Sequence, residues 1–221
     1  MCWKLEVFFL EIIYIGHSSF LLKTSIGKKI LMDPFKCKAI DDNLIGSINL
    51  VTVSHSHLSH CYVDPFKDKC KILMETGSYE ETDLRITGIS TYHDRDNGFR
   101  RGDNLLFIYE LEGLKLCHLG DLGHIPKEST LSFLENLDVI FIPIGGNFTL
   151  NSKEACSLCK IINPKIIIPM HYKDFYTTSN IQGVEDFIFD MKNGEKVCDA
   201  SLVLKNSVGL HNKVLILNPL R

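Results

Sequence analysis

The sequence predicts a mixed α/β protein in which β-sheets pack against each other and helices cover the outside. The first half of the chain is rich in short apolar segments bounded by turn residues, a pattern typical of strands. The second half alternates between helical and strand-like segments, which indicates sheets with helices packed outside them. The hydrophobic content of 45% and the charged content of 23% are ordinary for a globular protein and argue against a disordered chain.

Apolar runs in the first half predict strands at residues 11–15, 19–24, 29–32, 50–54, 70–74, 85–91, 105–111 and 114–119. Asp33-Pro34 ends the third of these, because proline cannot donate a hydrogen bond to a strand ladder. Glu112-Gly113 joins the last two as a hairpin.

In the second half, helices are predicted at residues 128–135, 152–162 and 184–191, and strands at 139–143, 165–169 and 213–217. We find no linker, low-complexity tract or internal repeat. We therefore expect one domain over residues 1–221, with residues 1–10 as an N-terminal extension ahead of the domain proper.

Charge and cysteine content bear on partners and location. The chain carries 24 basic and 27 acidic residues without a basic stripe, so nucleic acid is not an expected partner. Its eight cysteines form no regular framework, and we expect reduced thiols in a cytoplasmic protein. Cys156-x-x-Cys159 is interpreted as core packing on one helix face, since no second pair completes a zinc site.

The apolar N-terminal run is interrupted by Glu11 and is shorter than the ~20 residues that a spanning helix needs, so no membrane association is expected. The expected partner is a small-molecule substrate. Homo-oligomerisation is left open.

A histidine-rich stretch at residues 54–60 follows the strand predicted at 50–54 directly. His55 and His57 are two residues apart, so in extended chain their side chains point to the same side. The chain then turns, and His60 reaches a neighbouring position. Imidazole is the commonest neutral metal ligand near pH 7, so this spacing predicts a metal site.

Three later motifs, at residues 91–94, 118–124 and 169–172, also stand where predicted strands end. Each has a structural interpretation when taken singly: His93 as a buried core histidine, Gly-Asp-x-Gly around Asp121 as a tight turn, and His171 as a surface cap. Their order and their shared position after strands favour one common site.

With these motifs the sequence resembles the metallo-β-lactamase superfamily, whose signature is a strand, HxHxDH, and then distant His, Asp and His motifs. It is most similar to the branch of ascorbate-6-phosphate lactonases and small metal-dependent hydrolases. The residues that carry this closer resemblance are 15–20, 33–35, 92–94, 118–121, 143–149 and 168–172. The resemblance implies a four-layer αββα sandwich with metals at one edge of the paired sheets.

The resemblance also implies one or two divalent ions, with Zn²⁺ expected first and Mn²⁺ or Fe²⁺ as alternatives. The ligands that it implies are His55, His57 and His93 for one metal, His60 and His171 for a second, and Asp121 as a bridge. A metal-bound hydroxide would attack the substrate, with Asp121 holding it and accepting its proton, and His60 and His171 acting in catalysis through the second metal. Asp33 is expected to orient the histidine stretch from outside the ligand set.

Ser59 departs from the family pattern, which has an aspartate ligand of the second metal at this position. A hydroxyl is a poorer Zn²⁺ ligand than carboxylate, thiolate or imidazole, so Ser59 is expected beside the ligands rather than among them. Three alternatives stay open. The remaining ligands and water hold the second metal weakly; Cys61 or Asp64 substitutes, which is the least favoured; or the protein uses one metal or has lost activity.

Substrate binding is expected from His17, Arg101 and Asn147. Arg101 follows His93 and could bind a phosphate through forked hydrogen bonds, although the sequence alone favours a solvated loop arginine. Asn147 follows a Gly-Gly turn, for which turn chemistry is the alternative role. His124 receives no assigned role.

The function expected first is a metal-dependent hydrolase acting on a small ester, lactone or phosphoester. A nuclease-type phosphodiesterase of the same fold is one alternative, and the lack of a basic patch counts against it. A non-catalytic metal-binding or ligand-binding protein is another, and Ser59 keeps it open. A flavodiiron-type oxidoreductase fits poorly, because such proteins have glutamate where His57 stands.

Overall fold

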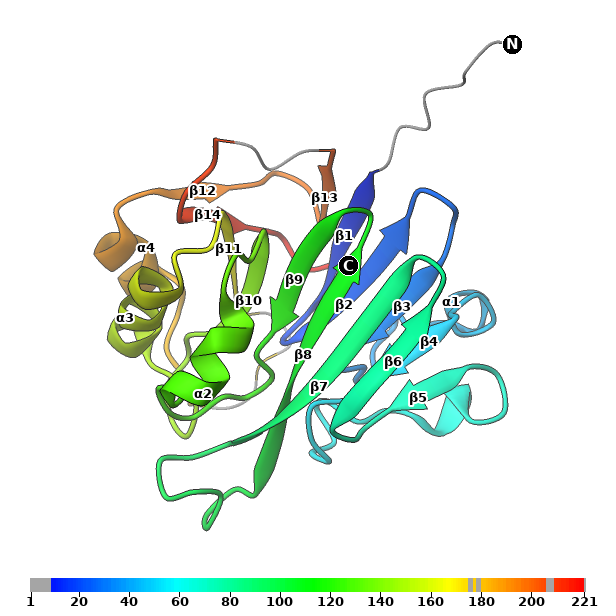
Figure 1. The fold of residues 1–221 in the computed structure, drawn as a ribbon, viewed down its shortest axis with the longest axis horizontal. Coiled ribbons are helices and arrows are strands. Elements are labelled where there is room, and N and C mark those ends of the chain that lie inside the picture. Colours follow the sequence, from blue (N-terminus) through cyan, green and yellow to red (C-terminus); the bar gives the residue numbers. More distant parts are fainter. Residues whose placement is uncertain (1–8, 175–176, 178–179, 206–208, 221) are drawn as a thin grey trace.

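The computed structural model describes residues 9–174, 177, 180–205 and 209–220. Two β-sheets face each other, with helices outside them (Figure 1). Among the described residues, the first sheet has six strands in the order β13-β1-β2-β3-β4-β5. These strands are β1 (Leu10–Gly16), β2 (Ser19–Thr24), β3 (Lys29–Met32), β4 (Leu50–Thr52), β5 (Lys71–Leu73) and β13 (Ser201–Leu204).

The second sheet, again within the described part of the chain, has eight strands in the order β12-β14-β11-β10-β9-β8-β7-β6. They are β6 (Gly77–Glu81), β7 (Leu84–Tyr92), β8 (Asp103–Leu111), β9 (Leu114–His118), β10 (Val139–Pro143), β11 (Ile166–Met170), β12 (Gly194–Lys196) and β14 (Lys213–Ile216). The antiparallel strands β6–β9 make a meander, and β9, β10, β11 and β14 run parallel.

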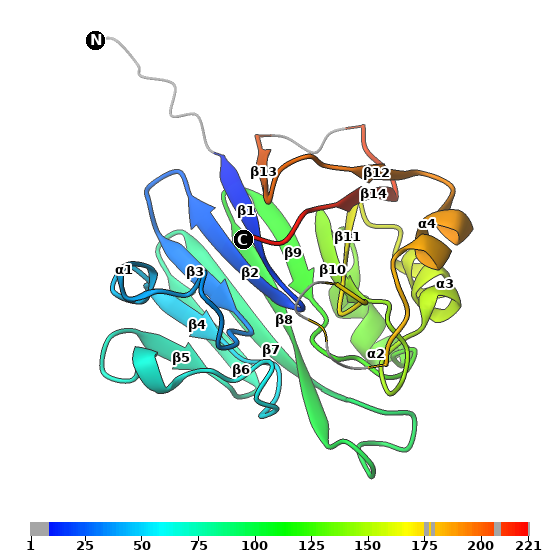
Figure 2. The same cartoon turned by 180° about the vertical axis from the view of Figure 1, so that it is seen from behind.

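The helical segments are α1 (Asp42–Ile45), η1 (Asp64–Phe66), α2 (Glu128–Leu131), η2 (Ser132–Leu134), α3 (Ser152–Ile162) and α4 (Glu185–Met191). Figures 1 and 2 show α2, α3 and α4 beside β10 and β11, and α1 on the other side of the molecule near β3 and β4. The predicted α/β fold with an αββα layer order is therefore confirmed. Of the helices in the described ranges, none is long and apolar enough to cross a membrane.

One hydrophobic core lies between the two sheets. Tyr14 and Phe20 from the first sheet pack in one cluster with Phe107, Tyr109 and Phe141 from the second, and each side chain is at most 1% exposed. A fully buried aromatic side chain stabilises a fold by about 1.5–3 kcal/mol, so this interface holds the two sheets at a fixed separation.

A second core lies under the helices on the outer face of the second sheet. Helix α3 begins at a capping box, in which Asn151 and Glu154 bond to each other's backbone N–H, and it ends at Asn163 with a left-handed φ of 52°. Its buried face includes Cys156 and Cys159, as expected from their three-residue spacing.

Several predicted elements need correction. Strands β6, β12 and β13 and helix α1 were not predicted; β6 and β12 are polar and exposed, so they lack the apolar alternation that marks a strand. The helix predicted at 128–135 is α2 followed by the 3₁₀ turn η2, because helix ends often tighten in this way. The strand predicted at 50–54 ends at Thr52.

The direction of the strands brings distant loops to one edge. Strands β3 and β4 pair in parallel, with Met32 opposite Thr52, so both end at the same level. Strands β9, β10 and β11 also pair in parallel. Strand β2 is antiparallel to both β1 and β3, so β1 and β3 run in the same direction. Strand β8 is antiparallel to both β7 and β9, so β7 and β9 also run in the same direction. Every predicted metal ligand follows the carboxyl end of such a strand.

Candidate metal centre

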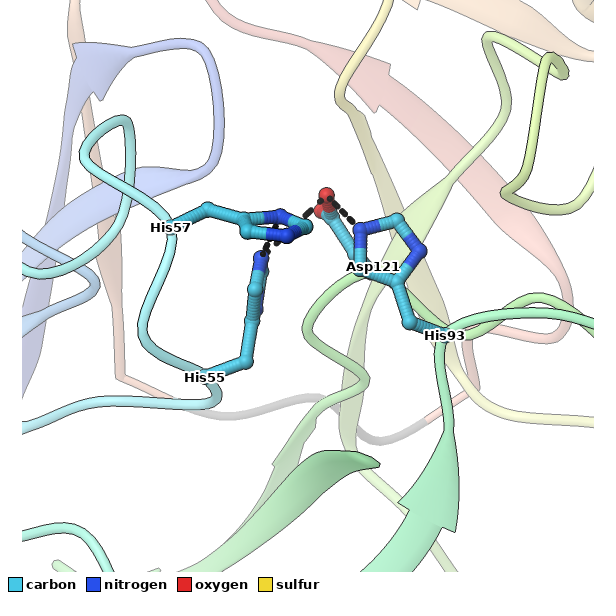
Figure 3. Close-up of side chains that lie close together, drawn as sticks. All are labelled: His55, His57, His93 and Asp121. Carbon is cyan, nitrogen blue, oxygen red and sulfur yellow. Dashed lines mark hydrogen bonds and ion pairs between the residues drawn. The ribbon is translucent and has the colours of Figure 1, made fainter. Parts of the chain in front are cut away.

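The histidine stretch converges on a point beyond the end of β4, but through a bend and not through extended chain as predicted. Because the strand ends at Thr52, His55 and His57 meet by curvature of the backbone around Ser56. The Nε2 atom of His55 lies 3.0 Å from Nδ1 of His57. Figure 3 shows the two rings facing His93 and Asp121, which come from the loops after β7 and β9.

Asp121 is the centre of the cluster. Its Oδ2 atom lies 3.1 Å from Nε2 of His93, 3.1 Å from Nε2 of His171, 3.3 Å from Nε2 of His60 and 3.7 Å from Nε2 of His55. The carboxylate is 3% exposed and the His60 side chain is fully buried. One carboxylate oxygen is thus surrounded by imidazole nitrogens from the loops after β4, β7 and β11.

Asp33 orients the histidine stretch through hydrogen bonds to His60 and Ser54. Its Oδ2 atom accepts a hydrogen bond from Nδ1 of His60 at 2.9 Å, which turns Nε2 of that ring toward Asp121. The same carboxylate accepts bonds from the backbone N–H of Ser54 at 2.7 Å and from its hydroxyl at 2.5 Å. Nδ1 of His55 lies 2.9 Å from the Ser54 hydroxyl. A carboxylate behind a ligating imidazole fixes its tautomer and its orientation.

The Gly120–Asp121 turn is held by Asn104, a residue that the sequence did not single out. Asn104 Oδ1 accepts the backbone N–H of Asp121 at 2.9 Å, and its amide group donates to the Leu119 carbonyl and the Thr91 hydroxyl. Gly120 has a φ of 56°, and a Cβ there would lie 2.3 Å from Asn104 Oδ1. The turn therefore requires glycine.

Burial and neighbouring charges shift the pKa values of Asp121 and His60 in opposite directions. Burial alone would raise the pKa of Asp121, but the neighbouring His171 and His60 hold it well below its usual value. Burial alone would lower the pKa of His60, yet Asp121 and Asp33 raise it to about 10. His55 is different: burial lowers its pKa to about 3, so its ring is neutral and available as a ligand.

The residues fit a metal ion by two observations. Within the described chain, Nε2 of His60, which faces Asp121, is buried without a hydrogen-bond partner, and so is Oδ1 of Asp121. Such atoms are rare in folded proteins unless a ligand or ion satisfies them. Donor atoms around a tetrahedral Zn²⁺ are about 3.3 Å apart, and the spacings around Asp121 Oδ2 lie between 3.1 and 3.7 Å. His55, His57, His93 and Asp121 form one group of converging donors, and His17, His60 and His171 form another.

A cavity of about 190 Å³ opens onto the cluster. Ser59, Arg101 and Asn147, named from the sequence, line it together with His17. Its wall also contains Phe35, Phe148, Thr177 and Ile181, to which the sequence analysis assigned no binding role.

Two other histidines of the motifs lie outside the cluster. His118 is buried; its Nε2 lies 2.8 Å from the Ser18 carbonyl, and its Nδ1 accepts the backbone N–H of Gly120 at 3.2 Å. It therefore supports the turn at Asp121 and does not face the cavity. His124 lies against Tyr92, with its Nδ1 3.0 Å from the Ile125 carbonyl.

Replacing Asp33 with asparagine should weaken metal binding by about 10–100-fold, the usual cost of losing a carboxylate behind a ligating imidazole. The amide can accept at one atom only, so His60 and Ser54 would lose at least one of their bonds. Competition against a chromophoric chelator measures the effect. Asp42→Asn, at an exposed position of α1, is the control. An affinity of Asp33→Asn within threefold of the wild type would contradict the role of Asp33.

Comparison with known proteins identifies the family of this chain. Residues 11–171 match the family described as the beta-lactamase superfamily domain. A UPF0173 metal-dependent hydrolase from Thermoplasma acidophilum is 31% identical over 199 residues, covering 75% of this chain and 84% of the relative. Another from Natranaerobius thermophilus is 29% identical over 190 residues, covering 72% and 82%.

Among solved structures, a candidate Zn-dependent hydrolase of the metallo-beta-lactamase superfamily from Thermotoga maritima is 32% identical. It superposes with a TM-score of 0.76 over 96% of this chain and 100% of that chain. The family match spans the segment from β1 to the loop after β11, which carries every residue of the cluster. The chain therefore belongs to the metallo-β-lactamase superfamily, in its group of UPF0173 metal-dependent hydrolases.

Proposed function

We propose that this protein hydrolyses a small ester, lactone or phosphoester that carries an anionic group, and that it does so with zinc at the histidine–aspartate cluster. The observation that carries the proposal is the buried Asp121 carboxylate with imidazole nitrogens converging on one of its oxygens. The names of the relatives as metal-dependent hydrolases, and of the Thermotoga maritima structure as a candidate Zn-dependent hydrolase, support the reaction class and the metal.

The residues that would hold metal are His55, His57, His93, His60, His171 and Asp121. Metal bound there would supply Lewis acidity toward the scissile carbonyl or phosphoryl oxygen and would lower the pKa of water. Asp121 stays ionised, because the surrounding imidazoles keep its pKa low. Its buried Oδ1 atom, which has no hydrogen-bond partner within the described residues, is free to accept a hydrogen bond from the attacking water and orient it.

Arg101 is proposed to bind the anionic group. Its guanidinium carbon lies 3.9 Å from the centre of the Phe148 ring, and both residues line the cavity. Stacking on an aromatic face holds a guanidinium in place and leaves its N–H edge free for a carboxylate or phosphate. Among the described residues Arg101 has no carboxylate partner, whereas Arg95 and Arg100 on the same loop both have one.

The loop and the ring that position Arg101 are both constrained. Asp94 accepts four backbone N–H bonds from that loop, including one from Arg101 at 2.7 Å. Asn147 and Phe148 have φ values of 53° and 95°, conformations that are costly for residues with a side chain. Such strain is typical of functional sites, where the surrounding structure holds a side chain in one place.

The test is hydrolysis of a panel of p-nitrophenyl esters, phosphomonoesters and phosphodiesters, together with simple lactones. We expect the Zn²⁺-loaded protein to turn over an anionic member of the panel, the chelator-treated protein to be inactive, and added Zn²⁺ to restore the rate. Metal binding without turnover of any member would overturn the proposal and favour a metal-binding protein.

Replacing Arg101 with glutamine should raise KM for the anionic substrate by about 10–100-fold, because a charged hydrogen bond contributes about 1.5–3 kcal/mol. KM for a neutral ester of similar size should stay unchanged. Arg100→Gln is the matched control, since Arg100 pairs with Asp96 and does not line the cavity. Equal increases of KM for the anionic and the neutral substrate in Arg101→Gln would refute the role.

A further inference from the structure

Serine at position 59 leaves the second half of the centre short of a ligand. His60, His171 and Asp121 offer three donors there, and Zn²⁺ in proteins takes four ligands, or three and a water at catalytic sites. Because Asp121 also faces His55 and His93, it is shared between the two halves. A further protein donor would bring the half around His60 and His171 to four protein ligands.

His17 stands beside this half. A nitrogen from each of the His17, His60 and His171 rings lies within 4.8 Å of the others. The His17 ring centre is 4.4 Å from that of His171 and 5.1 Å from that of His60. His17 is 9% exposed and borders the cavity.

The backbone around His17 is fixed while its ring is left without a hydrogen bond. The His17 carbonyl accepts the backbone N–H of His171 at 2.9 Å and the Tyr14 hydroxyl at 3.0 Å. Its own N–H donates to Asp174 Oδ2 at 3.0 Å. Within the described chain, the imidazole of His17 makes ring contacts only.

This arrangement is uncommon for a merely structural histidine. His17 has a φ of 55°, a left-handed conformation that costs free energy in a residue other than glycine. Its ring borders the cavity, and within the described residues it makes no hydrogen bond. Here the strained backbone directs the ring toward His171 and His60 with no partner in place, as expected for a ligand whose ion completes the site.

We propose that His17 is a metal ligand, which completes the second ion site with His60, His171 and Asp121 in place of the aspartate that Ser59 does not provide. Each half of the centre then has three imidazoles: His55, His57 and His93 in one, and His17, His60 and His171 in the other. The inference rests on the proposed metal-dependent function. It replaces the substrate-binding role that the sequence analysis expected for His17.

The experiment is a Co²⁺ titration of the metal-free protein, followed by visible absorption and by metal analysis after gel filtration. We expect two tightly bound ions per chain in the wild type and one in His17→Asn, since asparagine tolerates a positive φ but cannot reach as far. His17→Asn with Ser59→Asp should bind two again. His124→Asn, a histidine outside the cluster, is the control and should bind two.

Two ions in both the wild type and His17→Asn would overturn the inference and leave the proposed hydrolase intact. One ion in the wild type would overturn it as well, because the second half would then be incomplete with His17 present. No ion in the wild type would overturn the proposed function itself.

A measurement on the wild type covers the case in which His17→Asn does not fold. Long-range ¹H–¹⁵N spectra of the nine histidine rings, recorded with saturating Zn²⁺, count the rings with a metal-bound nitrogen. The inference predicts six such rings. Five, the number without His17, would overturn it.

Discussion

Replacing Asp121 with asparagine should abolish hydrolysis and reduce the bound metal to less than one ion per chain. Oδ2 of Asp121 lies 3.1 Å from Nε2 of both His93 and His171. Among the described residues, no other carboxylate oxygen pairs with both of these histidines. Without the negative charge of Asp121, the imidazoles alone would have to hold the divalent ions. We expect turnover to fall by about 10³-fold or more, as for other groups that stabilise charge directly at a reaction centre. Steady-state kinetics and metal analysis measure the two effects.

Asp138→Asn is the control for the loss of a buried carboxylate away from the centre. Asp138 is 7% exposed and accepts a hydrogen bond from Lys165 at 2.6 Å. It directly precedes β10, whereas the loops of the cluster follow the carboxyl ends of the strands. This variant should lose stability but keep its metal and its rate per folded molecule. Full metal content in Asp121→Asn, with turnover within tenfold of the wild type, would show that Asp121 is not the bridge.

Replacing Gly120 with alanine should destabilise the fold by about 2–5 kcal/mol. The added Cβ would lie 2.3 Å from Asn104 Oδ1 and 2.6 Å from Ser54 Cβ, and the φ of 56° is itself strained for alanine. Left-handed backbone costs about 1–2 kcal/mol and overpacking about 1–3 kcal/mol. Asn104 cannot move aside freely, because its amide makes bonds to Thr91, Leu119 and Asp121. Thermal unfolding should occur roughly 5–20 °C lower.

Gly113→Ala separates the backbone cost from the clash. Gly113 has a φ of 71° in the β8–β9 hairpin, and a Cβ there meets nothing within 4 Å. This variant should lose about 1–2 kcal/mol, the backbone term alone. Equal losses in Gly113→Ala and Gly120→Ala would contradict the packing described around Asp121.

The sequence predicted those elements whose pattern is set by burial. Strand β10 is buried at all five positions, and its predicted limits, residues 139–143, coincide with the observed ones. Helix α3 likewise has the predicted limits, because the apolar period ends at Asn163-Pro164. Strand β6 escaped prediction because four of its five residues are exposed, and its pairing with β7 rests on backbone bonds that no side-chain pattern reports.

The candidate ligands could be named from the sequence because they stand in short motifs after strands. The groups that position them could not, because their partners are distant along the chain. Tyr14 and His17 both bond to Asp174, about 160 residues away, and nothing local marks that contact. Ser54 was a detectable case: it stands between a buried strand and His55, where a hydroxyl can bond the carboxylate at the end of the adjacent β3.

The most direct test of the metal centre is a crystal structure of the Zn²⁺-loaded protein, with anomalous difference maps recorded on both sides of the zinc absorption edge. The account predicts one peak within coordination distance of His55, His57 and His93, a second beside His60 and His171, and Asp121 between them. A map without a peak at this cluster, from protein that binds zinc elsewhere, would contradict the assignment of these histidines as ligands.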